Sequence, residues 1–293
     1  MIVVKIQGGL GNQMFQFAFA SVIAEKNKTK VFLDLSIYDN HKKINGYTPR
    51  SFELNIFNNQ YKVATNKQIK KFYNLSFLNK IKKKFKFAYP KIVAENNLAF
   101  QPSFLIAQTP VNFIGYFQSY KYFDGFEDKI KQLFAFPIKN LSQNSKGALI
   151  SFKDKNTVSV HIRRGDYVTD SITNSVHGCC TIEYYQSAIS FLQTSVSDPT
   201  FVFFSDDSHW VKENFINLIC NKIFIDFNQG SDSWMDMYLM TQCQHNIIAN
   251  SSFSWWGAWL NNKSEKIVIA PKKWFVNQAN VSDDLLPENW LKI

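Results

Sequence analysis

Arginine is scarce in this sequence. Of its 33 basic residues, 30 are lysine and only Arg50, Arg163 and Arg164 are arginine. A guanidinium group offers phosphate a planar, bidentate fork, whereas the ammonium group of lysine is a point charge. Two adjacent arginines in a chain with so few arginines therefore suggest a site that needs the bidentate guanidinium group and in which lysine could not replace it.

Cysteine and long apolar runs are also scarce. Four cysteines in 293 residues, with no C-x-x-C spacing, exclude a disulfide scaffold and a common zinc pattern. No apolar run reaches the roughly 18 residues that a membrane-spanning helix needs. The N-terminus lacks the basic region, apolar stretch and cleavage site of a signal peptide. We therefore expect a cytoplasmic protein.

Positive charge and aromatic residues are abundant. The net charge of +10 favours an anionic partner, such as nucleic acid, an acidic membrane surface or a phosphorylated substrate. Residues 67–91 carry nine lysines interleaved with aromatic and aliphatic side chains. One interpretation of this segment is an interfacial helix that meets anionic lipid. The other, which we favour, is a pair of surface helices with solvated lysines and a buried aromatic face.

The order of the predicted elements indicates an α/β protein. A strand at residues 2–7, a glycine turn, a helix at 14–26 and a strand at 30–35 form the opening of a Rossmann-like domain. The second half alternates five short apolar strands with helices, which is typical of a parallel, doubly wound sheet. Those strands are expected at residues 157–162, 200–204, 222–227, 245–249 and 266–270. A polar stretch near residues 139–146 suggests two Rossmann-like domains, 1–145 and 146–293.

Three of these strands end in polar clusters. The first runs from His161 to Asp166, the second is Ser205-Asp206-Asp207, and the third begins at Asn250. In open parallel sheets, ligands bind at the carboxyl ends of the strands. The sequence therefore predicts a binding site where these clusters meet.

The His161–Asp166 cluster allows specific roles. Arg163 would clamp a diphosphate, and Arg164 would pair with a structural carboxylate. Asp166 would act as a general base or as a salt-bridge partner. The alternative is a purely structural ion cluster, which is costly to bury without anions.

The remaining polar motifs leave alternatives open. Asp206 and Asp207 would bind Mg²⁺, accept the N–H donors of guanine, or cap a helix. None of the 15 aspartates forms a D-x-D pair, which argues against metal. The stretch from Asn250 to Phe253 would cap a helix or bind phosphate. The turn at residues 8–11 is either a tight turn or a close approach to ligand, with Asn12 and Gln13 supplying amide hydrogen bonds.

Together the motifs at residues 8–16, 115–118, 161–168 and 250–256 resemble those of the bacterial α-1,2-fucosyltransferases. The resemblance implies a GT-B-like fold, in which two Rossmann-like domains with parallel sheets face each other across a cleft. It implies that the C-terminal half holds GDP-fucose and the N-terminal half shapes the acceptor cleft. The implied reaction is an inverting, metal-independent transfer of fucose to O2 of a terminal β-galactoside. Such an enzyme needs no cofactor and would serve surface-glycan synthesis, for example of lipopolysaccharide O-antigen.

The resemblance also implies roles for individual residues. Arg163 and Asp166 would be catalytic, with Asp166 as the base that takes the acceptor proton. The implied donor-binding residues are His161, Arg163, Arg164, Asp206, Asn250, Ser251, Ser252 and Phe253. The implied acceptor-binding residues are Gly9, Asn12, Gln13, Asp166 and Tyr167.

A different class of function competes with this one. The lysine-rich segment 67–91 is also typical of a basic, aromatic protein that binds nucleic acid or a membrane surface. The enzyme hypothesis expects no nucleic-acid partner. It allows peripheral contact of this segment with the anionic inner face of a membrane.

Overall fold

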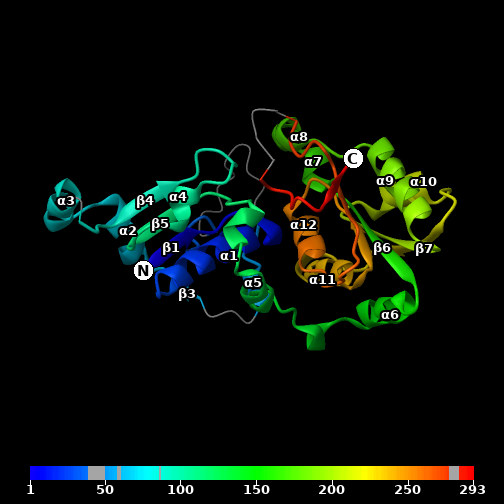
Figure 1. The fold of residues 1–293 in the computed structure, drawn as a ribbon, viewed down its shortest axis with the longest axis horizontal. Coiled ribbons are helices and arrows are strands. Elements are labelled where there is room, and N and C mark those ends of the chain that lie inside the picture. The colour runs from blue at the N-terminus through cyan, green and yellow to red at the C-terminus, as the bar shows by residue number, and fades with distance from the viewer. Residues whose placement is uncertain (39–49, 58–60, 86, 277–283) are drawn as a thin grey trace. The chain divides into compact units, whose positions relative to one another are not determined.

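The computed structural model describes residues 1–38, 50–57, 61–85, 87–276 and 284–293, apart from the side chains of Asp166 and Thr169. Its contacts divide the chain into two compact units (Figure 1). Unit 1 runs to Ala135 and takes in Asp284 and Leu285 near the C-terminus, whereas unit 2 begins at Phe136 and includes the last eight residues, from Leu286 to Ile293.

The domain boundary that we expected after residue 145 falls inside a helix, α6 (Gln143–Phe152). Ser142 caps this helix, since its side chain accepts a hydrogen bond from the backbone N–H of Ser145. Polar residues are preferred at helix starts as well as in linkers. The polar composition of this stretch therefore marks the beginning of a helix, and the change of unit comes earlier, between Ala135 and Phe136.

Unit 1 contains a five-stranded, fully parallel sheet in the order β3-β2-β1-β5-β4. The predicted strands at residues 2–7 and 30–35 are confirmed as β1 and β2, while β3 and β4 were not predicted. The strands are β1 (Ile2–Lys5), β2 (Val31–Asp34), β3 (Lys62–Val63), β4 (Lys91–Ala94) and β5 (Val111–Ile114).

Helix α1 (Leu10–Lys26) follows β1 and lies in the core of unit 1. Its Phe19 ring stacks on Phe117, with centroids 4.1 Å apart and planes 9° apart. Phe113 and Tyr122 meet the same ring edge-on, each with centroids 4.9 Å away. The helix is apolar on most sides because sheet and aromatic residues surround it. The other elements among the described residues of unit 1 are η1 (Leu54–Ile56), α2 (Asn66–Tyr73), α3 (Phe77–Lys84), α4 (Pro102–Leu105), η2 (Tyr120–Phe123) and α5 (Glu127–Leu133).

The lysine-rich segment forms the two surface helices that we expected, α2 and α3. Helix α2 buries Phe72 in a small cluster with Val3 and Ala64. Helix α3 buries none of its side chains. The predicted buried aromatic face is therefore wrong for α3, because this helix lies beyond the sheet of unit 1 and none of its side chains is buried by the described residues (Figure 1).

Unit 2 contains a six-stranded, fully parallel sheet in the order β11-β10-β9-β6-β7-β8. All five strands predicted for the second half are present, so the doubly wound parallel sheet is confirmed. The strands are β6 (Asn156–Ile162), β7 (Pro199–Ser205), β8 (Asn221–Ile225), β9 (His245–Ile247), β10 (Val268–Ala270) and β11 (Leu291–Lys292). The helices besides α6 are η3 (Ile138–Asn140), α7 (Gly165–Thr169), α8 (Ser171–His177), α9 (Ile182–Ser195), α10 (Ser208–Phe215), η4 (Gly230–Asp232), α11 (Trp234–Gln242) and α12 (Ser252–Trp259).

The two faces of this sheet carry separate cores. Val160 and Ile162 of β6 pack with α9 and α10. Val202 and Phe204 of β7 belong to the other core, with α6 and α11. Because strand side chains alternate between faces, His161 leaves β6 on the side opposite Val160 and Ile162. Its neighbour there is Phe253 of α12, with ring centroids 5.6 Å apart.

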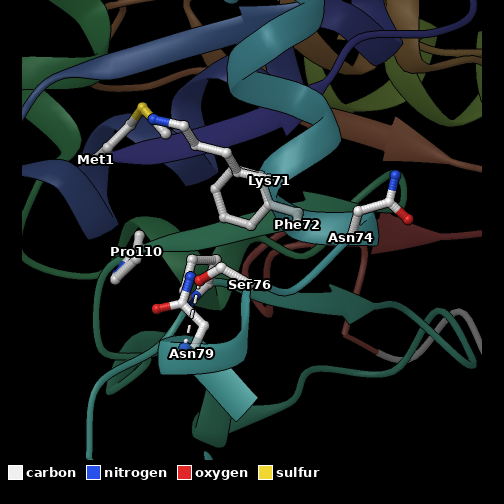
Figure 2. A pocket seen from close by; sticks show the side chains of 8 residues that line it. Met1, Lys71, Phe72, Asn74, Ser76, Asn79 and Pro110 are labelled. Carbon is white, nitrogen blue, oxygen red and sulfur yellow. Dashed lines mark hydrogen bonds between the residues drawn. The ribbon is translucent and has the colours of Figure 1, made fainter. Parts of the chain in front are cut away.

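A cavity of about 410 Å³ lies in unit 1, beside α2 and the start of α3 (Figure 2). Lys71, Asn74, Ser76 and Asn79 contribute polar atoms to its wall, and Phe72 and Pro110 contribute apolar ones. None of the predicted site residues lines it. Along the described parts of the chain, no helix combines the length and apolar character needed to cross a bilayer.

The glycine turn before α1 yields a prediction about stability. Gly8 has φ +79°, and a Cβ atom there would lie 2.5 Å from Nδ2 of Asn12. Gly8→Ala should therefore lower the free energy of unfolding by about 1–3 kcal/mol, measured by urea denaturation. Gly147→Ala is the control, because a Cβ atom at this helical position meets nothing within 4 Å. Equal stability of the two variants would contradict the strained turn.

Candidate functional site

The carboxyl ends of β6 and β7 lie side by side in unit 2. Their register pairs His161 with Phe204 and Ile162 with Ser205. The residues that follow each strand therefore leave the same edge of the sheet. This brings together the His161–Asp166 cluster and the Asp206-Asp207 pair, as the sequence predicted.

Arg163 is held in place by Asp206. Its guanidinium forms an ion pair with Oδ2 of Asp206, and the backbone N–H of Arg164 donates to Oδ1 at 2.9 Å. The Arg163 guanidinium also lies over the Tyr167 ring, 5.4 Å from its centroid. Gly165 makes the ion pair possible, because a Cβ atom there would collide with Oδ2 of Asp206. Both carboxylate oxygens of Asp206 thus support the arginine segment, and its contact with guanosine stays a prediction.

Arg164 has a different environment. Its Nε donates to Oδ2 of Asp207 at 3.1 Å, and its guanidinium lies 3.9 Å from the centroid of Trp210. Asp207 also caps α10, because Oδ1 accepts from the Trp210 backbone N–H at 3.2 Å. The expected pairing of Arg164 with a structural carboxylate is therefore present. Its direct contact with a donor stays a prediction.

His161 is buried with an unsatisfied nitrogen. Its exposed fraction is 6%, and Nδ1 has no hydrogen-bond partner among the described residues. Burial, with a further contribution from the charge of Arg163, lowers the pKa of His161 to about 3. The ring is therefore neutral near pH 7. A buried, unsatisfied polar atom is costly, and such atoms are found at functional sites.

Asn250 ties three chain segments together just after β9. Its Nδ2 lies 2.9 Å from the carbonyl oxygen of His177, 3.1 Å from that of Gly178 and 3.2 Å from that of Trp274. Its Oδ1 accepts from the thiol of Cys180 at 3.4 Å. The amide is thus committed to the scaffold, and direct donor contact by this side chain stays a prediction.

The start of α12 fits the capping interpretation. Ser251 is the N-cap, and its Oγ accepts from the Phe253 backbone N–H at 3.3 Å. Ser252 is half-buried in the first turn, and Phe253 lies beside His161. The helix therefore begins close to the buried imidazole, and contact of its first amides with a phosphate stays a prediction.

Tyr167 and His177 form an aromatic stack near the arginine. Their rings are 5.0 Å apart and inclined by 10°. The Tyr167 hydroxyl donates to the carbonyl oxygen of Asn250 at 3.2 Å. The Asp166 backbone lies in α7, but its side chain is outside the described residues, so its role as a base stays a prediction. We did not predict that His177 packs against Tyr167, because no sequence pattern indicates that these two rings stack.

In unit 1, Gln13 is a scaffold residue. Its side chain is fully buried. Nε2 donates to the carbonyl oxygens of Gly8 and Ser51, at 2.8 Å each. Oε1 accepts from the backbone N–H of Glu53 at 2.8 Å. Contact of Gln13 with the acceptor, as predicted, would therefore require some of these hydrogen bonds to break.

Gly9 and Asn12 lie on the same turn. Gly9 is the N-cap of α1, in extended conformation. Asn12 is half-buried, and its Oδ1 accepts from Nε2 of Gln118 at 2.7 Å. This bond links the first motif to the motif at residues 115–118. The two motifs are thus neighbours at the carboxyl edge of the unit 1 sheet, and their acceptor contacts stay predictions.

Two carboxylates at this edge were missed from the sequence. Burial raises the pKa of Glu53 and of Glu95 above the ordinary value. Glu95 follows β4 and accepts from the backbone N–H groups of Tyr116 and Phe117, the former at 2.7 Å. Glu53 accepts from the Leu10 N–H at 3.1 Å. Neither belongs to a recognisable motif, so only their positions beside the glycine turn and β5 reveal them.

The family assignment comes from comparison with known proteins. The whole chain, residues 1–293, matches the family described as Glycosyl transferase family 11. The chain belongs to this family. It is therefore a glycosyltransferase of family 11, which confirms the resemblance seen in the sequence motifs.

Three relatives of this family 11 member illustrate its range. It is 35% identical to an Alpha-1,2-colitosyltransferase of Escherichia coli, over 100% of this chain and 99% of that one. It is 32% identical to the O-antigen biosynthesis glycosyltransferase WbnK of Escherichia coli, over 98% of this chain and 99% of that one. It is 33% identical to the Galactoside 2-alpha-L-fucosyltransferase SEC1 of Bos taurus, but over only 35% of this chain and 28% of that one.

Solved structures agree on the fold. POFUT1 in complex with GDP aligns over 91% of this chain and 97% of that chain, with a TM-score of 0.51 and 10% identity. A likeness at that identity shows the fold alone. With two parallel-sheet units, the family 11 chain has the GT-B-like α/β fold that the resemblance implied.

Asp236 of the family 11 chain is a further residue that sequence patterns missed. It lies at the start of α11, and its Oδ1 accepts from Nδ2 of Asn228 at 2.8 Å. Burial, opposed by the hydrogen bond from Asn228 and aided by the nearby charge of Asp226, raises the pKa of Asp236 to about 7. The folded protein thus retains a proton that the unfolded chain releases near pH 4.

This raised pKa predicts how stability depends on pH. The stabilising effect of the retained proton is complete below pH 4 and is lost as pH rises through about 7. Asp236→Asn cannot ionise and keeps the oxygen that Asn228 contacts. Between pH 5 and 7, the wild type should therefore lose unfolding free energy relative to this variant, by up to about 1.4 kcal/mol per pH unit. Denaturation at several pH values measures this, and parallel curves for the two proteins would contradict it.

Proposed function

We propose that this family 11 glycosyltransferase transfers L-fucose from GDP-fucose to O2 of a terminal β-galactoside. The reaction inverts the configuration at C1 of the sugar and needs no metal ion. The acceptor belongs to a surface glycan of the O-antigen kind. The names of the three relatives support this proposal, since they include an α-1,2-linking transferase, an O-antigen transferase and a galactoside fucosyltransferase.

One observation carries the proposal: Arg163, held by Asp206, lies at the carboxyl edge of a parallel sheet beside a neutral, buried histidine. Nucleotides bind at this edge in doubly wound sheets. A fixed guanidinium there suits a diphosphate. The neutral ring of His161 adds no second charge beside Arg163, and its unsatisfied, buried Nδ1 would bond the nucleotide once the ring is uncovered.

The proposed chemistry follows from these groups. The O2 hydroxyl of the galactoside attacks C1 of fucose, and the bond between C1 and the diphosphate oxygen breaks. The leaving GDP keeps the electron pair, and Arg163 stabilises the negative charge that develops on it. Donors fixed in advance at such a position contribute roughly 3–4 kcal/mol each. The hydroxyl proton passes to Asp166, the proposed base.

A second donor competes with fucose. The relative with 35% identity over the whole chain is named for colitose, which is fucose without the hydroxyl at C3. A site that hydrogen-bonds a hydroxyl discriminates strongly against a sugar that lacks it, whereas a site that only tolerates it does not. We favour fucose because the four motifs resemble the fucosyltransferases, and the donor is open to direct measurement.

The decisive experiment offers the purified protein GDP-fucose and GDP-colitose with a panel of β-galactosides. We expect a product with fucose α-linked to O2 of galactose, located by NMR. The value of kcat/KM for GDP-fucose should exceed that for GDP-colitose by at least about 100-fold, because a site selective for fucose would hydrogen-bond the C3 hydroxyl that colitose lacks. EDTA should leave the rate unchanged. A preference for GDP-colitose would show that colitose and not fucose is the sugar transferred, and a requirement for Mg²⁺ would overturn the metal-free mechanism.

Arg163→Lys tests the diphosphate contact. Lysine keeps the charge but loses the fork, so kcat/KM should fall by about 100-fold or more. Stabilisation by GDP in a thermal shift assay should fall as well. Lys153→Arg, on the opposite edge of the sheet, is the control and should behave as wild type. Near wild-type turnover of Arg163→Lys would contradict the clamp.

The same assays separate two roles for Asp166. As the base, Asp166→Asn should lower kcat while the thermal shift with GDP is retained. A loss confined to GDP binding would instead assign this residue to the structure of the donor site.

A further inference from the structure

Helix α3 presents its large apolar side chains to solvent. Phe77 is 76% exposed and Leu78 69% exposed, and Phe85 at the C-cap is 64% exposed. Ile81 is also exposed. An isolated helix of this length is marginal in water and is ordinarily stabilised by burying an apolar face. The face of α3 therefore lacks the partner that such a face requires within the described parts of unit 1.

The exposed side chains form a single stripe. At 100° per residue, Phe77, Leu78, Ile81 and Phe85 fall within an arc of roughly 100° on the helix. The lysines of α3 occupy the rest of its circumference, and Lys82 and Lys84 flank the stripe. This separation of apolar and basic faces is typical of a helix that lies in the plane of a bilayer surface.

The charge around the stripe has one sign. Helices α2 and α3 expose the seven lysines Lys67, Lys70, Lys71, Lys80, Lys82, Lys83 and Lys84. The sequence from Asn66 to Lys91 contains no aspartate or glutamate. We define the α2–α3 surface as these lysines together with the stripe. Its charge is complementary to an anionic lipid surface, near which each lysine contributes roughly 1 kcal/mol to binding in the general case.

We propose that the α2–α3 surface docks this protein on an anionic lipid bilayer, with the stripe of α3 inserted among the headgroups and the lysines around it. Helix α2 anchors the surface to unit 1 through buried Phe72, and α3 lies outermost in the same unit (Figure 1). A second copy of the chain fits less well, because two such surfaces would bring like charges together. Single-stranded nucleic acid also fits less well, because half of the stripe, Leu78 and Ile81, offers no ring for base stacking.

Vesicle sedimentation tests this proposal with the full-length protein. The protein should sediment with vesicles of phosphatidylcholine that contain phosphatidylglycerol, far more weakly with phosphatidylcholine alone, and less as salt increases. The variant Lys82→Gln/Lys83→Gln/Lys84→Gln should bind about 100-fold more weakly, since each lysine contributes roughly a factor of five. The variant Phe77→Gln/Leu78→Gln should lose at least about tenfold, because the insertion of apolar area is removed.

Matched controls lie in unit 2. Lys153→Gln/Lys155→Gln/Lys272→Gln removes the same charge, and Ile150→Gln/Ile219→Gln removes two side chains that are 75% and 93% exposed. Both controls should bind vesicles as the wild type does. Circular dichroism should show all variants folded. Equal losses in controls and α2–α3 variants would overturn the proposal, because they would indicate attraction through net charge alone.

Three further outcomes would overturn it. They are equal binding to neutral and anionic vesicles, a concentration-dependent dimer that the α3 variants abolish, and RNA binding that replaces vesicle binding. The proposal does not depend on the donor or acceptor. Transfer to a soluble β-galactoside should be unchanged in the α3 variants, so an absence of transferase activity in the wild type would count against the proposed function and leave the vesicle result standing.

Discussion

The ion pair between Arg163 and Asp206 organises the candidate donor site. It joins the segments that follow two neighbouring strands, β6 and β7, and so fixes where a guanidinium stands at the edge of the sheet. Gly165 is required beside it, because any side chain would displace the carboxylate. A charge held in advance needs little reorganisation when a diphosphate leaves. The proposed catalysis therefore depends on a contact that exists before substrate arrives.

A second layer of contacts holds the loops around this pair. Asn250 binds the end of α8 and the segment around Trp274 through one side-chain amide. Tyr167 stacks on His177 and donates to the backbone of Asn250. Loops carry most binding residues but have few backbone hydrogen bonds of their own. Here the hydrogen bonds of the Asn250 and Tyr167 side chains hold these loops in one conformation.

The first unit uses the same strategy with glutamines. Gln13 and Gln16 are fully buried, and their amides link the glycine turn to Ser51 and to Gly115. A polar residue in a motif therefore has two possible reasons to be there, ligand contact or support of the backbone. For Gln13, Asn250 and Arg164 the structure shows the support directly. Arg163 and His161 are the residues for which we propose direct contact with the donor.

The sequence by itself determined the α/β class, the five strands of the second half and the family. Buried parallel strands are continuous apolar runs, and the chemistry of the Arg163-Arg164 pair is local, so both are visible in a linear pattern. Strands β3 and β4 were missed because β3 has only two residues and the apolar part of β4 is only the three residues 92–94, so neither stands out as an apolar run. Only the tertiary structure decided which partner each polar residue has. Arg164 meets Asp207 across 43 positions and Gln13 meets Glu53 across 40, and no periodicity encodes such pairings, because the packing of strands and helices sets them.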